Sequence, residues 1–230
     1  MRPTAPFLSA VFLLLLIGPG AARPANAQAD PYPTMAPLGQ YQMPQEAEVA
    51  MARSAAPASV SSHATVMVLG RKGYTTVATG TNGFTCLVER GWGAATDAAD
   101  FWNPKVRAPH CFNAAAARTF LPIYLLKTKL VLAGKSKADI LRGVKAAFAS
   151  HELPALAPGT MVYMMSKEQY LNDEGKNWHP HLMFYVADAT AASWGGNLPG
   201  SPVIAADDPQ EHVTIMMVVV RHWSDGTAAP

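Results

Sequence analysis

Three histidines late in the chain have the type and spacing of metal ligands. His179 and His181 stand two residues apart at the start of a strand-like run, so their side chains are expected on the same face of a strand. Imidazole suits zinc, copper, iron or nickel, and His212, at the start of a later strand-like run, is the candidate third ligand. A divalent metal held in this way would support a metal-dependent, hydrolytic enzyme. The competing interpretation is that these histidines only lead into two strands.

This metal hypothesis depends on how the two strands pair. Antiparallel neighbours would place the two strand starts at opposite ends of the sheet, whereas parallel neighbours would place them together. The connection between the strands is long enough for a parallel crossover, which needs about a dozen residues or more. The site therefore requires parallel pairing or a loop that folds back.

The chain has two cysteines, Cys86 and Cys111. An even pair in an exported protein predicts a disulfide, which would stabilise the fold by about 3.5 kcal/mol through the entropy of loop closure. The alternative is a catalytic thiolate, which needs an adjacent base; His110 is a neighbour of Cys111 in sequence, which does not orient its ring. We favour the disulfide, and expect it to fasten the segment 91–113 to the strand that contains Cys86.

Four residues around this segment are candidates for ligand binding. Glu89 and Arg90 end a strand-like run; the carboxylate could act as a general base, but an ion pair at the strand end is the simpler interpretation. Trp92 and Trp102 follow in the irregular segment 91–113. Their rings could line a ligand-binding face or anchor the loop on the core, and the sequence does not separate the two.

Methionines form a further group of candidates. Thioethers bind Cu(I), yet each of these methionines lies in an expected core strand, where methionine fills gaps in the packing. We therefore favour core packing for the whole group: Met161, Met164, Met165, Met183, Met216 and Met217.

Common catalytic and nucleotide-binding motifs are incomplete in this sequence. Gly134-Lys135-Ser136 resembles the end of a phosphate-binding loop, but the glycine required five residues earlier is replaced by Lys129. His151-Glu152 begins a zinc-protease motif without its second histidine. No G-x-S-x-G or G-x-G-x-x-G run occurs.

The elements that must position these residues fall into three groups along the chain. Three strand-like runs at 65–69, 74–79 and 84–89, with Asn82-Gly83 before the last, predict a meander. Apolar residues at helical spacing predict two central helices, within 118–132 and 136–151. Runs at 160–165, 181–186 and 213–223 predict three C-terminal strands. Strands, then helices, then strands predict a single α+β domain with a mostly antiparallel sheet, spanning residues 61–225.

The N-terminal part of the chain has a different composition. An apolar run at 7–17, a Gly-Pro-Gly break and the small-x-small site Ala25-Asn26-Ala27 predict a signal peptide over residues 1–27. Eleven apolar residues are too few to span a bilayer, which needs roughly 20. Residues 28–60 are rich in Pro and Ala and predict an extended or disordered leader, in which a short helix at 45–56 is an option.

The charge of the chain argues against one class of partner, nucleic acids. The full chain has 18 Lys+Arg and 16 Asp+Glu; removal of 1–27 takes away Arg2 and Arg23, so the mature chain would carry 16 of each. Nucleic-acid binding needs a basic stripe to displace counterions, and the basic residues here are scattered. We therefore expect no nucleic-acid partner.

One stretch of the sequence resembles a known group of proteins. The run Gly80–Arg90 (GTNGFTCLVER), with Cys111 and the run 179–185 (HPHLMFY), resembles an uncharacterised family of exported bacterial proteins. The resemblance covers roughly residues 64–220. It implies an exported bacterial protein, and it implies no activity and no catalytic residue.

These observations lead to one favoured function and two alternatives. We expect an exported domain, periplasmic or extracellular and not embedded in the membrane after signal cleavage. It would bind a small molecule or an envelope protein without catalysis and without a cofactor. The alternatives are the metal-dependent hydrolytic enzyme that uses His179, His181 and His212, and a structural envelope protein.

Overall fold

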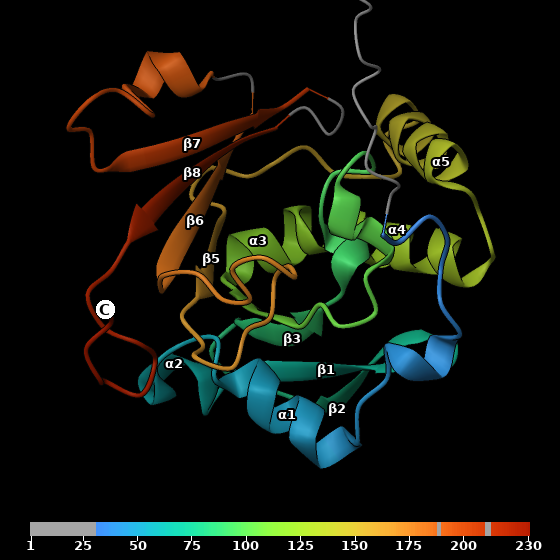
Figure 1. Cartoon of the computed structure of the whole chain (residues 1–230), viewed down its shortest axis with the longest axis horizontal. Helices are drawn as coiled ribbons and strands as arrows, with labels where there is room; N and C mark the ends of the chain where they lie inside the picture. Colours follow the sequence, from blue (N-terminus) through green and yellow to red (C-terminus); the bar gives the residue numbers. More distant parts are fainter. Residues whose placement is uncertain (1–30, 188–189, 210–212) are drawn as a thin grey trace, which may run out of the picture.

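The computed structural model describes residues 31–187, 190–209 and 213–230, which form one eight-stranded sheet (Figure 1). The strand order is β2-β1-β3-β4-β5-β6-β8-β7, and every neighbouring pair is antiparallel except β1 and β3. The strands are β1 Thr65–Gly70, β2 Gly73–Ala78, β3 Thr85–Glu89, β4 Ala108–Phe112, β5 Met161–Met164, β6 His181–Val186, β7 Val203–Asp208 and β8 Val213–Val219. The prediction of a single α+β domain with a mostly antiparallel sheet is confirmed.

The predicted N-terminal meander is wrong in its last step. β1 and β2 form a hairpin, but β3 lies parallel to β1 on its other side. The connection turns sharply at Gly80, where a Cβ atom would lie 2.2 Å from the backbone nitrogen of Thr65. Asn82 does not make a two-residue hairpin turn, because its side chain donates to the carbonyl oxygen of Val60 and accepts from the backbone N–H of Phe84.

The described part of the predicted disordered leader, residues 31–60, is folded. It contains a 3-10 turn η1 (Leu38–Gln40) and the helices α1 (Gln45–Arg53) and α2 (Ala58–Ser61). Pro44 and Pro57 immediately precede the two helices, so these prolines start helices instead of extending a coil. The segment is held by buried side chains, among them Tyr41, Glu48 and Ala52, and the prediction of disorder is wrong for these residues.

Two strands replace segments that were expected to be irregular. The segment 91–113 contains the 3-10 turns η2 (Gly91–Gly93) and η3 (Ala99–Trp102) and then β4, which pairs with β3. β4 holds Pro109, a residue that argues against a central strand, and this explains why the pattern concealed it. The expected loop 190–210 contains the 3-10 turn η4 (Ala191–Trp194) and β7, so the C-terminal part has four strands, not three.

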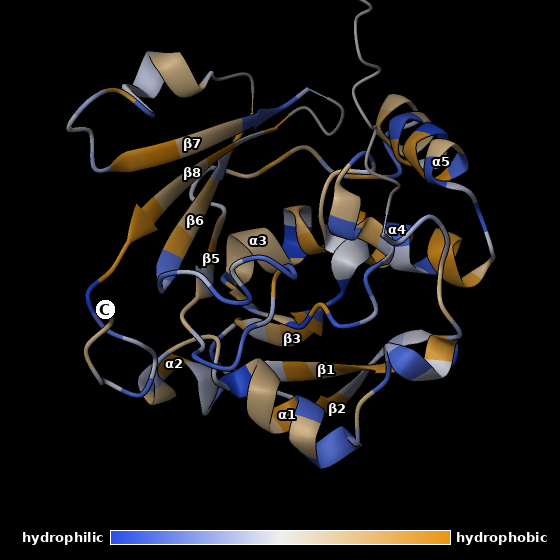
Figure 2. Cartoon of the chain, in the orientation of Figure 1, coloured by the Kyte–Doolittle hydropathy of each residue, from blue (hydrophilic) through white to orange (hydrophobic). Residues whose placement is uncertain are grey.

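The helices cover both faces of the sheet (Figures 1 and 2). α3 (Ala114–Thr119), α4 (Leu121–Leu132) and α5 (Lys137–Ala149) follow β4, so the helical region holds three helices instead of two. Side chains of α3, α4 and α5 share one core with the sheet-face residues Leu87, Phe112 and Tyr185. α1 packs on the opposite face of the sheet, near Cys86 and Cys111.

Within the described residues, no helix is both long enough and apolar enough to cross a bilayer. The predicted signal peptide, residues 1–27, lies outside the described residues.

Candidate functional site

A cavity of about 530 Å³ lies on the face of the sheet that carries α3 and α4. Its floor comes from five strands of the sheet, β3, β4, β6, β8 and β7, and most of the residues from one strand are two apart, so they face the same side. Its wall comes from the loop after β3, with Phe120 and Leu171. The strand residues that line it are Glu89, Ala108, His110, Met183, Tyr185, Ala206, Asp207, Asp208, Val213 and Ile215.

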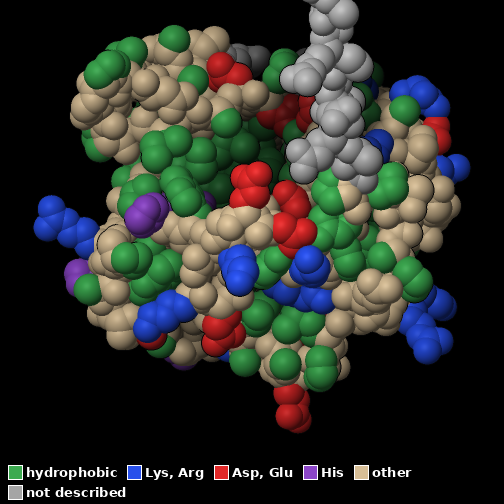
Figure 3. Space-filling model, viewed as in Figure 1, with side chains coloured by type: hydrophobic (Ala, Val, Ile, Leu, Met, Phe, Trp, Pro, Cys, Tyr) green, Lys and Arg blue, Asp and Glu red, His purple; other side chains and the backbone are tan. Residues whose placement is uncertain are grey.

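The cavity combines an apolar floor with acidic groups. Acidic side chains among the described lining residues are Glu89, Asp97, Asp100, Asp207 and Asp208, and Arg90 is the one lysine or arginine among them. Figure 3 shows a hollow on this side of the molecule with hydrophobic side chains inside it and acidic side chains nearby. A ligand with a positive charge and an apolar body matches such a lining.

The positive charge of Arg90 is directed away from the cavity. Its guanidinium is fully buried and donates to Glu48 Oε1 at 2.8 Å and to the carbonyl oxygen of Tyr41 at 2.7 Å. Glu48 Oε1 also accepts from the backbone N–H of Leu69. This pair joins α1 to the end of β3, so the predicted ion pair at the strand end exists with Glu48 as the acid instead of Glu89.

Glu89 and His110 are buried ionisable neighbours on the cavity floor. Glu89 Oε2 lies 4.0 Å from His110 Nδ1. The same nitrogen lies 2.9 Å from the carbonyl oxygen of Ala108. A carbonyl oxygen can only accept, so Nδ1 carries the hydrogen and Nε2 has the lone pair in the neutral ring.

Burial keeps His110 neutral. Loss of solvation lowers the pKa of its imidazole to about 4, against the opposing effect of the hydrogen bond to Ala108. The ring is stacked on Phe112, with ring centroids 5.8 Å apart. His110 is therefore an uncharged polar group on the cavity floor at neutral pH.

Gly93 fits closely over the carboxylate of Glu89. A Cβ atom at position 93 would lie 2.1 Å from Glu89 Oε2. A side chain at position 93 would therefore require the Glu89 carboxylate to move. Lys127 of α4 also holds the loop, since its Nζ donates to the carbonyl oxygen of Ala94 at 2.7 Å.

The four sequence candidates for ligand binding separate into two pairs. Glu89 and Arg90 line the cavity. Trp92 is completely buried, and its Nε1 donates to Thr128 Oγ1 at 2.9 Å, which anchors the loop on α4. Trp102 borders a second cavity of about 550 Å³ beside the start of α5, where no buried titratable side chain is present among the described lining residues.

His179 and His181, the first two predicted metal ligands, lie in different environments. His181 is buried in β6 and its Nδ1 lies 2.7 Å from the carbonyl oxygen of His179, whose own side chain is exposed. The indole of Trp178 contacts both rings, with centroids 4.7 Å from His181 and 5.9 Å from His179.

His212, the predicted third ligand, lies outside the described residues. β6 and β8 are antiparallel, with His181 opposite Val219 and Val186 opposite Thr214. The start of β8 thus lies at the far end of β6 from His181, so the parallel pairing is absent, and of the two arrangements that the hypothesis allows only a loop that folds back remains. No group of three His, Cys, Asp or Glu side chains suited to a metal occurs in the described part of the chain.

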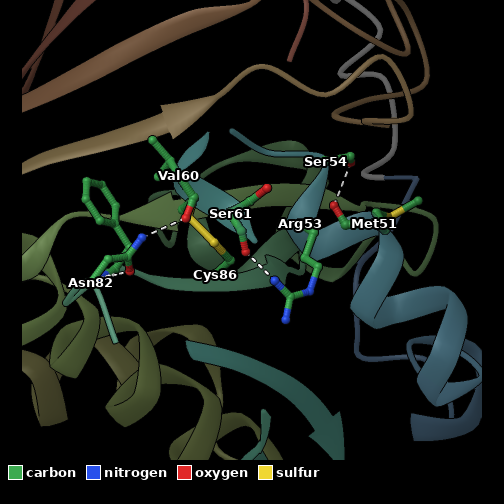
Figure 4. Close-up of a disulfide and its surroundings, with 9 residues drawn as sticks. Met51, Arg53, Ser54, Val60, Ser61, Asn82 and Cys86 are labelled. Carbon is green, nitrogen blue, oxygen red and sulfur yellow. Dashed lines mark hydrogen bonds between the residues drawn. A yellow bond between two sulfur atoms is a disulfide. The ribbon is translucent and has the colours of Figure 1, made fainter. Parts of the chain in front are cut away.

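The predicted disulfide is confirmed. Cys86 and Cys111 are bonded and stand directly opposite each other on β3 and β4, so the bond joins two paired strands instead of fastening an irregular loop. Figure 4 shows Cys86 beside α1 and α2, where Arg53 donates to the carbonyl oxygen of Ser61. The bond lies on the opposite face of the sheet from the cavity.

The cavity was missed at the sequence level. Its acidic residues Asp97, Asp100 and Asp208 come from segments read as loops, and only the pairing of β4 and β7 brings those segments to one face. His110 was noted only as a neighbour of Cys111. A strand pattern for 108–112 would have placed it on the same face as Glu89, but Pro109 hid that pattern.

No family model, curated protein or solved structure matches this chain. The resemblance to exported bacterial proteins stays a prediction.

Proposed function

We propose that the protein binds a small organic cation with an apolar body, for example an aralkyl amine, in the cavity on the sheet face. The lining of this cavity carries the proposal, because an apolar floor lies beside several carboxylates. Its volume of about 530 Å³ is in the range of small-molecule sites, which measure roughly 300–1,000 Å³.

The apolar floor supports a ligand with a hydrocarbon or aromatic part. Met183, Tyr185 and Ile215 come from adjacent strands and present their side chains to the same side of the sheet. Phe120 stacks on Tyr185 with ring centroids 3.8 Å apart, which extends the apolar wall toward the helices. Burial of an apolar ligand against these groups contributes about 25 cal/mol to the binding free energy for each Å² of apolar surface removed from water.

The carboxylates support a positive charge on the ligand. Asp97 is exposed, and Asp100 accepts from Asn103 Nδ2 at 2.7 Å, which fixes its orientation. Negative groups that converge on one cavity raise the local concentration of a cation and disfavour an anion. Since exposed carboxylates are screened by salt, affinity should fall with ionic strength.

We propose binding without catalysis. Support comes from the Glu89–His110 pair, in which the imidazole hydrogen on Nδ1 is given to a backbone carbonyl oxygen at 2.9 Å and the carboxylate stands at 4.0 Å. In an activated acid–base pair the two side chains are typically within hydrogen-bond reach of each other, and these two are not. We further propose that the chain is exported, which the disulfide Cys86–Cys111 supports, because such bonds persist in oxidising compartments.

The test compares three compounds with one carbon skeleton: 3-phenylpropylamine, 3-phenylpropan-1-ol and 3-phenylpropanoate. Calorimetry and thermal unfolding of the full chain should show binding and stabilisation by the amine, a weaker effect of the alcohol and none of the carboxylate. Equal binding of amine and carboxylate would contradict the proposal.

Variants of selected carboxylates test whether those that line the cavity attract the amine. Asp97→Asn together with Asp100→Asn should weaken amine binding about two- to tenfold, the range for exposed charge pairs. Glu152→Gln removes an exposed carboxylate that does not line the cavity and should leave binding unchanged. If both variants weaken binding to the same degree, the carboxylates of the cavity have no special role.

A further inference from the structure

Two buried histidines and a methionine form a row across three adjacent strands. Met164 of β5 stands opposite His181 of β6. On the other side of β5, Cys111 pairs with Tyr163 and Phe112 with Val162, so the same antiparallel register brings His110 beside Met164. Residues opposite each other in such a register point to the same face, with Cβ atoms about 4.5–5.5 Å apart.

The three side chains share one buried environment. Exposed fractions are 7% for His110, 5% for Met164 and 2% for His181. Neighbouring strands lie about 4.8 Å apart, so the histidine backbones stand about 10 Å apart with Met164 between them. Two imidazoles that lean toward a central ion can span this separation.

Both imidazoles have the same hydrogen-bond arrangement. His110 Nδ1 faces the carbonyl oxygen of Ala108 at 2.9 Å, and His181 Nδ1 faces that of His179 at 2.7 Å. In each neutral ring Nδ1 therefore holds the hydrogen and Nε2 the lone pair. Among the described residues, neither Nε2 takes part in a hydrogen bond. A ring held through Nδ1 by a backbone carbonyl is the usual state of a histidine that binds metal through Nε2.

Two further observations concern the surroundings of His181. Burial lowers the pKa of His181 to about 4, and the nearby imidazole of His110 contributes in the same direction. Gln169, whose Nε2 donates to the carbonyl oxygen of Trp178, has a buried Oε1 atom with no hydrogen-bond partner. Trp178 packs on His181 with ring centroids 4.7 Å apart. Gln169 is thus linked to His181 only through Trp178, and its Oε1 is a buried acceptor that the described residues leave unsatisfied.

We propose that His110, Met164 and His181 bind a soft monovalent metal ion, with Cu(I) as the natural occupant. Thioether and imidazole together select Cu(I) over hard divalent ions. Zinc sites normally use three or four histidine, cysteine or carboxylate ligands, and the row offers two. Glu89, 4.0 Å from His110 Nδ1, supplies negative charge beside the site. This inference is independent of amine binding, although His110 also lines that cavity.

The experiment titrates the metal-free full chain with Cu(I) under anaerobic conditions in competition with a chromogenic chelator; Ag(I) serves as a redox-inert probe and Zn(II) as a hard-ion control. We expect one Cu(I) or Ag(I) per chain bound more tightly than any other equivalent, and no matching Zn(II) site. X-ray absorption should show both nitrogen and sulfur ligands. Failure of the chain to compete for Cu(I), or a ligand shell without sulfur, would overturn the proposal.

A matched pair of methionine variants distinguishes ligation from packing. Met164→Leu keeps the apolar volume and removes the thioether, and should weaken Cu(I) binding by about tenfold or more. Met165→Leu changes a buried neighbour outside the row and should leave Cu(I) affinity unchanged. Circular dichroism of both variants verifies the fold. Equal affinities in the two variants would show that Met164 is only a core residue.

Discussion

The carboxylate of Glu89 and the imidazole of His110 face each other across neighbouring strands, with Oε2 4.0 Å from Nδ1. The histidine nevertheless donates from Nδ1 to its own strand, to the carbonyl oxygen of Ala108. The floor of the cavity thus combines a carboxylate with a neutral imidazole whose Nε2 lone pair takes no part in that bond. The proposed cation site depends on this part of the lining.

Acid should destabilise the metal-free fold through its buried histidines. The pKa of His110 is about 4 in the fold and about 6.5 in an unfolded chain, so between these values the unfolded state binds more protons and stability falls as pH falls. The full effect is about 3 kcal/mol for this residue. Urea unfolding from pH 7 to pH 4, with a chelator present, measures it. His110→Gln should lose part of this pH dependence, and an unchanged slope would contradict the assignment.

Loss of the Glu48–Arg90 pair should be costly. Glu48→Gln would leave a fully buried guanidinium without its counter-charge, and we expect a loss of about 3–5 kcal/mol in the free energy of unfolding. Lys167→Gln removes one partner of an exposed ion pair with Asp225 and should change stability little, since solvent screens such pairs. Denaturant unfolding of both variants gives the comparison; similar losses would show that the buried pair is not special.

Reduction of the disulfide should lower stability without closing the cavity. Cys86 and Cys111 are 25 residues apart in sequence, and release of a loop of this length costs about 3.5 kcal/mol. Because the bond lies on the opposite face of the sheet, the reduced chain should still bind the amine at temperatures where it remains folded. Thiol titration of unreduced, denatured protein should find no free sulfhydryl, and two free thiols would contradict the bond.

Substitution of Gly93 should disturb the cavity more than the fold. A methyl group at position 93 collides with Glu89 Oε2, so Gly93→Ala must displace the carboxylate or the loop after β3. Amine affinity should fall several-fold. Gly39→Ala is the control, because no atom lies within 4 Å of a Cβ built there. Calorimetry with 3-phenylpropylamine compares the two variants, and equal affinities would show that the loop does not shape the site.

Local sequence patterns predicted one helix start and the disulfide, each for a clear physical reason. The helix expected within 136–151 was recognisable because the residues concerned are close in sequence, and it begins with a bond from the backbone N–H of Asp139 to Ser136 Oγ. The disulfide followed from an even pair of cysteines. Both predictions depend on chemistry that needs no knowledge of strand order.

Features that depend on distant pairing could not be predicted in this way. Asn82-Gly83 indicated a hairpin, yet the backbone of the preceding Gly80 packs against residues 63–65 and carries β3 to the far side of β1. Pro109 concealed β4, and with it the position of His110 beside Glu89. The acidic side of the cavity depends on β7, whose pairing with β8 places Asp208 opposite Val213.

The most direct test of amine binding is a map of the bound amine by nuclear magnetic resonance. The methyl groups of Ala108, Met183 and Ile215 line the cavity, and 3-phenylpropylamine should shift these signals while 3-phenylpropanoate leaves them unchanged. Signals of Val131 and Ala138, which line the second cavity, serve as the internal control and should stay in place. Shifts confined to Val131 and Ala138, or equal shifts with the amine and the carboxylate, would contradict a cation site on this face of the sheet.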